Sequence, residues 1–356
     1  MPEPSTTVRL ASCASAAPDF VLTQETAIEF ANQHYSSVLR RRSIELLRQF
    51  LAHPAIATRH IAVDGIADLI CLKNEDPDRR IARFTGAALD LAEKAARAAL
   101  GRCGASTGEV AGIIVNTCTG YICPGLSTYL IERLGLTPST EAYDLVGSGC
   151  GGALPNLRMG ADIAARAGGR PVLCISVEIC SATFQMADDI SLLLSNAIFG
   201  DGAAAAVVWD RPQGLSVVGN AASFAPQYRD EVRFVHKNGA LHNSLSLQLP
   251  GIMREVAPPF IRSLLAAHGL DAEHVQHWAL HPGGEKILDG IVEEMGLAAS
   301  AASVSREVLR DFGNMSSPTV LFALEKLMER GIAPGEYCCA VAYGAGLSLH
   351  GLLLRG

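Results

Sequence analysis

The chain has 356 residues, of which 49% are hydrophobic and only 18% are charged, so a sizeable buried core is expected. Its formal net charge of −7 argues against non-specific nucleic-acid binding, which needs a basic face to displace counterions. Residues 1–20 lack an apolar stretch behind a basic end, and no run approaches the roughly 18 apolar residues of a membrane-spanning helix. We therefore expect a cytoplasmic protein with no membrane partner and no secretory signal.

The predicted elements alternate between helix and strand along the chain. In chain order, apolar spacing predicts helices over 23–35, 36–53 and 76–104, a strand over 110–118, a helix over 124–136, a strand over 141–149, a helix over 151–168, and strands over 170–179 and 201–210. Residues 211–251 show only short strands and loops. Beyond them the pattern predicts a helix over 251–269, a strand over 274–281, helices over 283–296, 305–313 and 316–331, and strands over 337–344 and 347–356. The paired prolines at 258–259 predict the start of a helix or a kink.

This alternation occurs twice, and each half ends with a glycine-bearing turn that leads into a strand, at 199–209 and at 342–354. Short apolar strands between helices imply sheets that are covered on both faces. The sequence therefore predicts an α/β fold with two similar halves, residues 1–215 and 216–356.

Ten cysteines are present, but none forms a Cys-x-x-Cys pair, and no histidine pair has the spacing of a zinc site. Most of them lie inside apolar runs, where free cysteine packs as a small hydrophobic side chain. Cys150 differs, because in "DLVGSGCGGALPN" it follows a predicted strand and a Gly-Ser-Gly turn and begins a predicted helix. A helix start lowers the pKa of a thiol, so a nucleophile is one interpretation. A disulfide, a metal ligand and a buried packing thiol are the alternatives.

Two further residues lie at junctions between elements. His281 in "WALHPGG" ends a predicted strand, and Asn314 in "DFGNMSSPTV" precedes a predicted helix. Taken singly, His281 could simply terminate a strand and Asn314 could simply cap a helix. Because such junctions in α/β folds face one crevice, the three residues together predict a nucleophile, a base and a hydrogen-bond donor.

Five blocks of the sequence resemble the signature blocks of type III polyketide synthases, the chalcone-synthase-like branch of the thiolase superfamily. They are "GSGCGGALPNLRMGADIA", "SVEICSATF", "AIFGDGAAAAVV", "ALHPGGEKILD" and "FGNMSSPTVLFALE". The resemblance covers the chain from the region of Arg80 to its end. It implies a thiolase fold with duplicated αβαβα layers, a homodimer, and acyl-CoA and malonyl-CoA as substrates. No metal and no cofactor besides these CoA thioesters is implied.

The resemblance also implies roles for single residues. Cys150 carries the starter acyl group, and His281 and Asn314 stabilise the carbanion formed when malonyl-CoA loses carbon dioxide. The grown chain then cyclises to an aromatic or pyrone product. Phe199 matches a gating phenylalanine, Leu245 or Leu247 stands where a second one is expected, and Ala345 lies in "AYGAG", where the family has Gly-Phe-Gly-Pro-Gly. The remaining implied residues are Cys118, Thr119, Thr183 and Glu178 at the substrate pocket, Cys123 at the pocket and the dimer partner, and Arg59 at the CoA phosphates.

Two alternative functions stay open from the sequence. A ketoacyl synthase of the initiation type shares the Cys, His and Asn logic but condenses once and takes malonyl from a carrier protein. An inactive homologue would act as a binding or scaffold subunit, although a relaxed site should lose its glycine corners. Extension from malonyl-CoA without a carrier protein distinguishes a polyketide synthase from a ketoacyl synthase, and failure of iodoacetamide to label Cys150 preferentially near neutral pH would favour the inactive homologue.

Overall fold

The computed structural model describes residues 8–237 and 240–356. Its strands are β1 (Arg9–Ala16), β2 (Val21–Thr23), β3 (Thr58–His60), β4 (Gly112–Asn116), β5 (Glu141–Leu145), β6 (Val172–Glu178), β7 (Gly202–Trp209), β8 (Leu215–Phe224), β9 (Val232–Lys237), β10 (Ala240–Leu245), β11 (Val275–Leu280), β12 (Tyr337–Gly344) and β13 (Ser348–Arg355). Its α-helices are α1 (Gln24–Tyr35), α2 (Arg41–Leu51), α3 (Ile66–Cys71), α4 (Pro77–Cys103), α5 (Leu126–Leu134), α6 (Ala153–Ala164), α7 (Ile190–Ile198), α8 (Leu249–Ala266), α9 (Glu285–Met295), α10 (Ser303–Phe312) and α11 (Thr319–Arg330). The predicted helices and strands form near their expected positions.

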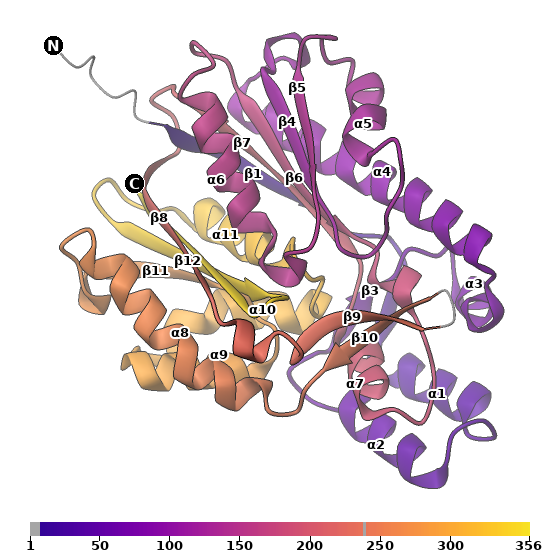
Figure 1. The fold of residues 1–356 in the computed structure, drawn as a ribbon. Coiled ribbons are helices and arrows are strands. Elements are labelled where there is room, and N and C mark those ends of the chain that lie inside the picture. The colour runs from indigo at the N-terminus through magenta and orange to yellow at the C-terminus, as the bar shows by residue number, and fades with distance from the viewer. Residues whose placement is uncertain (1–7, 238–239) are drawn as a thin grey trace, which may run out of the picture.

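One nine-stranded sheet runs through both halves of the described chain, in the order β11-β12-β13-β8-β1-β7-β6-β4-β5 (Figure 1). The first half contributes β1 and β4 to β7, and the second half contributes β8 and β11 to β13. The two sets are joined where β1 pairs with β8, through Arg9 with Ser216 and Leu10 with Leu215. The strands of both halves therefore approach one another in the middle of the molecule.

The central strand β1 was not predicted from the sequence, and neither was helix α7. β1 reads RLASCASA, and it pairs along its length with β7, which reads GAAAAVVW. Sequence analysis recognises a strand by its large β-branched and aromatic residues. β1 is instead built from small residues, because helices pack closely on both of its faces.

The core clusters arrange the molecule in five layers. On β6, Leu173 and Ile175 face the cluster that contains α4, while the alternate residue Cys174 faces the cluster that contains α6 and α11. Successive strand residues point to opposite faces, so each strand contacts two helical layers. In the second half, β12 is shared in the same way between the α6 and α11 layer and the outer helices α8 and α9. This is the αβαβα arrangement of the thiolase fold.

Local signals explain where the long helices begin and end. Asp76 accepts a hydrogen bond from the backbone N–H of Arg79 at the start of α4, Pro77 occupies the first turn, and Gly104 ends the helix with φ 69°. The expectation that the paired prolines begin a helix is wrong, because Pro258 and Pro259 lie inside α8 and not at its start.

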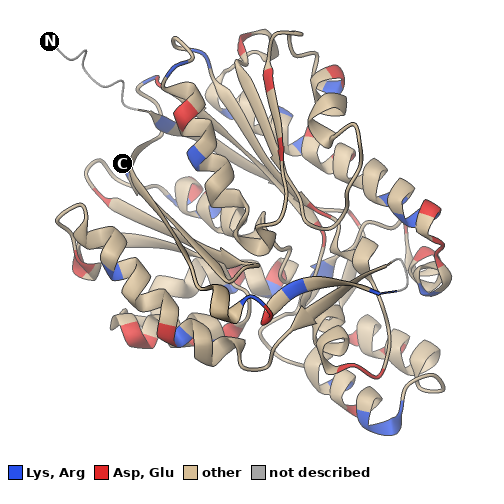
Figure 2. Cartoon of the chain, viewed as in Figure 1, with Lys and Arg blue, Asp and Glu red and all other residues tan. Residues whose placement is uncertain are grey.

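A smaller cluster of helices lies beside the sheet. Helices α1, α2, α3 and α7 pack together through Tyr35, Leu47, Leu69 and Leu193 (Figure 1). Charged residues lie mainly on the helices and loops, and the central strands are almost free of them (Figure 2). The low charge content of the sequence therefore reflects buried layers on both sides of the sheet.

Candidate active site

Cys150 lies on a tight turn between β5 and α6. Gly147 and Gly149 have φ angles of 93° and 53°, a left-handed conformation that side-chain-bearing residues rarely adopt. Residues 149–151 form a single 3₁₀ turn, and α6 begins at Ala153. A Cβ on Gly344 would collide with the carbonyl oxygen of Ser148, so the turn between β12 and β13 packs backbone to backbone against the Cys150 turn. Glycines from both halves thus allow the close approach.

His281 directly follows β11 and continues its ladder, because its N–H donates to the Val341 carbonyl at 2.8 Å. The side chain is 1% exposed. Neither ring nitrogen has a hydrogen-bond partner among the described residues. The ring of Tyr343 packs edge-on against the imidazole, with 5.0 Å between the centroids. The imidazole is therefore held by packing, and both of its nitrogens remain free for a ligand.

Asn314 lies in the connection between α10 and α11. Its backbone is anchored on both sides, since its N–H donates to Ile198 at 2.9 Å and its carbonyl accepts from Gly200 at 3.0 Å. Its side-chain Oδ1 accepts the N–H of Ser316 at 2.8 Å. Ser316 has φ 61°, a strained conformation for a residue with a side chain. Because Oδ1 is used in this turn, the Nδ2 group is the part of the amide that can donate to a ligand.

Cys150, His281 and Asn314 line one cavity of about 290 Å³. The remaining wall is largely apolar, and Phe199, Leu245 and Leu247 are part of it. His53, Glu285 and the exposed Lys286 also line the cavity. The structure therefore brings together the three junction residues that are far apart in the sequence.

The electrostatic environment of the thiol differs from the sequence-based expectation. Burial raises the pKa of Cys150 to about 12, and a hydrogen bond with Ser316 opposes this only in part. The prediction that a helix start lowers this pKa is therefore wrong, since Cys150 sits on a single 3₁₀ turn and desolvation has the largest influence on its pKa. Burial also lowers the pKa of His281 to about 3. The free site favours a neutral thiol and a neutral imidazole.

Glu178 lies at the end of β6 and is completely buried. Its Oε2 accepts the N–H groups of Cys118 and Thr119 at 2.9 and 3.1 Å, and its Oε1 accepts the Ser317 hydroxyl at 2.7 Å. Burial raises the pKa of the Glu178 carboxyl, while these hydrogen bonds oppose the rise. Glu178 thereby ties the loop after β4 to the loop that carries Asn314.

The predicted pocket residues Cys118, Thr119, Cys123, Glu178 and Ala345 are not among the residues that line this cavity. The Cys118 Sγ lies 3.4 Å from the Ser316 hydroxyl, whereas the Thr119 side chain faces Glu178 and not the cavity. Ala345 packs beside the Cys150 turn, because a Cβ on Gly149 would lie 3.1 Å from its backbone nitrogen. Cys123 is exposed on the surface.

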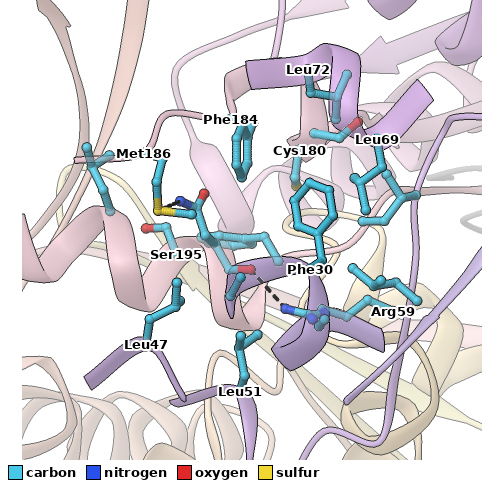
Figure 3. Close-up of a pocket in the computed structure, with 18 of the residues that line it drawn as sticks. Phe30, Leu47, Leu51, Arg59, Leu69, Leu72, Cys180, Phe184, Met186 and Ser195 are labelled. Carbon is cyan, nitrogen blue, oxygen red and sulfur yellow. Dashed lines mark hydrogen bonds between the residues drawn. The ribbon is translucent and has the colours of Figure 1, made fainter. Parts of the chain in front are cut away.

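Thr183 lines a second cavity, of about 80 Å³, between α1, α2 and α7. Figure 3 shows this cavity with Phe30, Leu47 and Ser195 among the side chains around it. Phe199 lines both cavities and so lies between them. Apolar side chains form most of the second cavity, among them Phe30, Leu47 and Leu72.

Arg59 also lines the second cavity, and its predicted role at the CoA phosphates is wrong. The side chain is 3% exposed, and its guanidinium donates to the carbonyl oxygens of Asn196 and Ala197 at 2.8 and 2.5 Å (Figure 3). These carbonyls lie in the last turn of α7, where the helix has no partners for them. Burial lowers the pKa of Arg59 to about 10. Arg59 caps a helix inside the protein and cannot reach a phosphate in solvent.

Sequence reasoning missed several residues of the site. The sequence analysis singled out neither His53 nor Lys286, although Lys286 follows "HPGG" closely. Tyr343 carried no prediction of its own, although it lies in the same "AYGAG" block as Ala345. Lys286 could have been found because it lies five residues after His281, and Tyr343 because it lies in the glycine-bearing turn "AYGAG". His53 lies near no predicted site residue, so the sequence carried no signal for it.

No helix among residues 8–237 and 240–356 combines the length and apolar character that crossing a membrane requires. Within the same ranges, no group of three or more His, Cys, Asp or Glu side chains has an arrangement that could hold a metal ion.

Comparison with known proteins identifies the family. The models of the N-terminal and C-terminal domains of chalcone and stilbene synthases match residues 8–212 and 217–356. A 3,5-dihydroxyphenylacetyl-CoA synthase of Streptomyces toyocaensis is 30% identical over 320 residues, 87% of this chain and 82% of the relative. An "alpha-pyrone synthesis polyketide synthase-like" protein of Mycobacterium tuberculosis is 27% identical over 99% of this chain and 92% of the relative.

A solved structure agrees with these sequence relatives. The 1,3,6,8-tetrahydroxynaphthalene synthase of Streptomyces coelicolor, described as a bacterial type III polyketide synthase, superposes with a TM-score of 0.89 and 26% identity over 98% of this chain and 99% of that chain. The two domain models together span nearly all of the sequence. The chain therefore belongs to the chalcone and stilbene synthases and is an acyltransferase of the type III polyketide synthase family.

Proposed function

We propose that this protein loads an acyl-CoA starter on Cys150, extends it by decarboxylative condensation with malonyl-CoA, and releases an aromatic or pyrone product. One observation carries the proposal: a thiol, an imidazole and an amide donor from three separate junctions line one largely apolar cavity. The names of the relatives, which include a dihydroxyphenylacetyl-CoA synthase and an α-pyrone synthase-like protein, support this product class.

In the loading step the Cys150 thiol transfers its proton to His281 as the sulfur attacks the thioester carbonyl of the starter. Burial penalises each charge alone, but the proton transfer creates both charges together, and they attract each other strongly in a cavity of low dielectric. The new C–S bond forms, the bond to CoA breaks, and CoA leaves as a thiol with the proton from His281. The acyl group then remains on Cys150.

In the extension step the malonyl thioester oxygen accepts hydrogen bonds from His281 and from Nδ2 of Asn314. The bond to the carboxylate breaks, carbon dioxide leaves, and the electron pair moves onto that oxygen, where the two donors stabilise it. The resulting carbanion attacks the acyl carbonyl, and the Cys150 sulfur leaves as thiolate. All electrons and protons are accounted for by the substrates and these side chains, so we propose no cofactor besides the CoA thioesters.

A substrate panel tests the proposed function. We expect malonyl-CoA, alone or with a series of aromatic, short-chain and long-chain acyl-CoAs, to give products whose masses show more than one extension without any carrier protein. A single extension that requires malonyl-carrier protein would instead indicate a ketoacyl synthase of the initiation type. Binding without any turnover would indicate a scaffold subunit.

We further propose a homodimer formed through the edge of the sheet at β5. This strand ends the nine-stranded sheet, and three of its five residues are exposed. Tyr121, Tyr143 and Val146 are exposed nearby by 75%, 37% and 63%. An exposed edge strand flanked by large apolar side chains is a site for pairing with a second copy.

Light scattering after size-exclusion chromatography tests the dimer. We expect a mass of twice 37.5 kDa for the natural chain, and a shift toward the monomer for Tyr143→Lys, because two lysines would then face each other across the two-fold axis. The matched control is Gln276→Lys on β11, at the opposite edge of the sheet, which should leave the dimer intact. A monomer in the natural chain would contradict the proposal.

The ten cysteines are all free, as is usual in a reducing compartment. Together with CoA thioesters as substrates, this supports a cytoplasmic location.

A further inference from the structure

Tyr343 lies near the end of β12 and lines the same cavity as Cys150, His281 and Asn314. The side chain is 3% exposed, and its ring packs edge-on against the His281 imidazole at an interplanar angle of 77°. The resembled family has a phenylalanine at this position of its glycine-rich loop. The present chain therefore adds a hydroxyl group beside the proposed base, and the proposed function does not use it.

The hydrogen bonds of this hydroxyl leave its proton free. The Gly283 N–H donates to the Tyr343 oxygen at 3.0 Å. A backbone N–H can only donate, so the phenolic oxygen is the acceptor and its own hydrogen takes no part in this bond. Within the ranges that the structure describes, no protein acceptor is paired with that hydrogen.

The hydroxyl is not needed to satisfy Gly283. The same N–H also donates to the His281 carbonyl at 3.0 Å, so it would keep a partner without the phenol. A Cβ on Gly283 would collide with the Tyr343 oxygen. Gly283, which follows His281 by two positions, thus provides the space in which the hydroxyl sits.

The Tyr343 hydroxyl keeps its proton between pH 6 and 9. Burial raises the pKa of Tyr343 well above its usual value, and the nearby Cys150 contributes to the rise. The group is therefore a neutral hydrogen-bond donor.

We propose that the Tyr343 hydroxyl is a third donor, after His281 and Asn314, to the malonyl thioester oxygen that becomes negatively charged on decarboxylation. When the bond to carbon dioxide breaks, the electron pair moves onto this oxygen, and the phenolic hydrogen bonds to it while staying on Tyr343. The Tyr343 ring packs against the His281 imidazole and lines the cavity that also holds Cys150 and Asn314, which supports this role. This inference rests on the proposed function of the site.

The variant Tyr343→Phe tests the inference, because it removes only the hydroxyl and restores the side chain of the resembled family. We expect the decarboxylation of malonyl-CoA, followed by mass spectrometry of the acetyl-CoA formed, to fall about 10-fold in kcat with an unchanged KM, since the interaction is made only in the transition state. Loading of the starter on Cys150, measured as the mass of the acyl-enzyme, should stay within about twofold. The ratio of the two decarboxylation rates should not change between pH 6 and 9, because Tyr343 does not titrate there.

The matched control is Tyr337→Phe on the same strand, where the ring lies against Arg355 at 5.3 Å and outside the cavity. This variant should decarboxylate malonyl-CoA as the natural enzyme does. Equal decarboxylation by Tyr343→Phe and the natural enzyme would overturn the inference, and so would an equal loss of loading, which would mean that the hydroxyl acts through the fold or through His281. A natural enzyme that never decarboxylates malonyl-CoA would overturn the proposed function as well.

Discussion

Replacing Cys150 with alanine is expected to abolish acyl loading and to lower product formation by about 10⁴ to 10⁶-fold, the range found when a covalent nucleophile is removed. The physical reason is that the acyl group needs a sulfur at this position of the cavity, within reach of the carbanion formed beside His281 and Asn314. Intact-protein mass spectrometry after incubation with an acyl-CoA measures the loading directly.

The control for this variant is Cys71→Ala, which removes an exposed thiol on α3. It should load the starter as the natural enzyme does. Cys118 is a second thiol close to Ser316, and peptide mapping decides between the two sulfurs. Persistent acyl-enzyme in Cys150→Ala would mean that the nucleophile has been assigned to the wrong residue.

The second large effect is expected for Asn314→Asp. The aspartate keeps the oxygen that accepts the Ser316 N–H, so the loop between α10 and α11 should retain its conformation. It replaces the donating NH₂ group with an oxygen that repels the developing enolate. We expect decarboxylation of malonyl-CoA to fall by about 10² to 10³-fold, while the loading of Cys150 remains.

A matched control is Asn32→Asp on α1, where the side-chain oxygen accepts a hydrogen bond from Arg48 and lies outside both cavities. This variant should have natural activity. If Asn314→Asp lost loading and decarboxylation to the same degree, Asn314 would be supporting the cavity rather than donating to the substrate.

Desolvation lowers the reactivity that we expect of the Cys150 thiol in the free enzyme. A thiol that begins a helix in solvent would be alkylated quickly near neutral pH. Here burial holds the pKa of Cys150 near 12, so the free enzyme carries little thiolate at pH 7. Slow alkylation of the free enzyme would consequently not argue for an inactive scaffold, because the proposed mechanism forms the thiolate only as the proton moves to His281.

The sequence by itself determined most of the elements and the three residues at their junctions. The periods of α4 and α11, the apolar runs of β4 and β6, and the glycine turns around Cys150 and His281 are local patterns, and local patterns are set by neighbouring residues. Since strand ends in α/β folds point to one crevice, three junction residues could be grouped before any coordinates were known.

The tertiary structure alone decided what depends on contacts between distant segments. β1 is a central strand because small residues fit between helical layers, and its composition carries no strand signal. Arg59 caps α7 because Asn196 and Ala197, which are 137 and 138 positions further along the chain, bring their carbonyl oxygens to its guanidinium. The pKa of Cys150 and the free hydroxyl of Tyr343 likewise follow from burial, since desolvation and hydrogen-bond partners are created only when remote parts of the chain pack together.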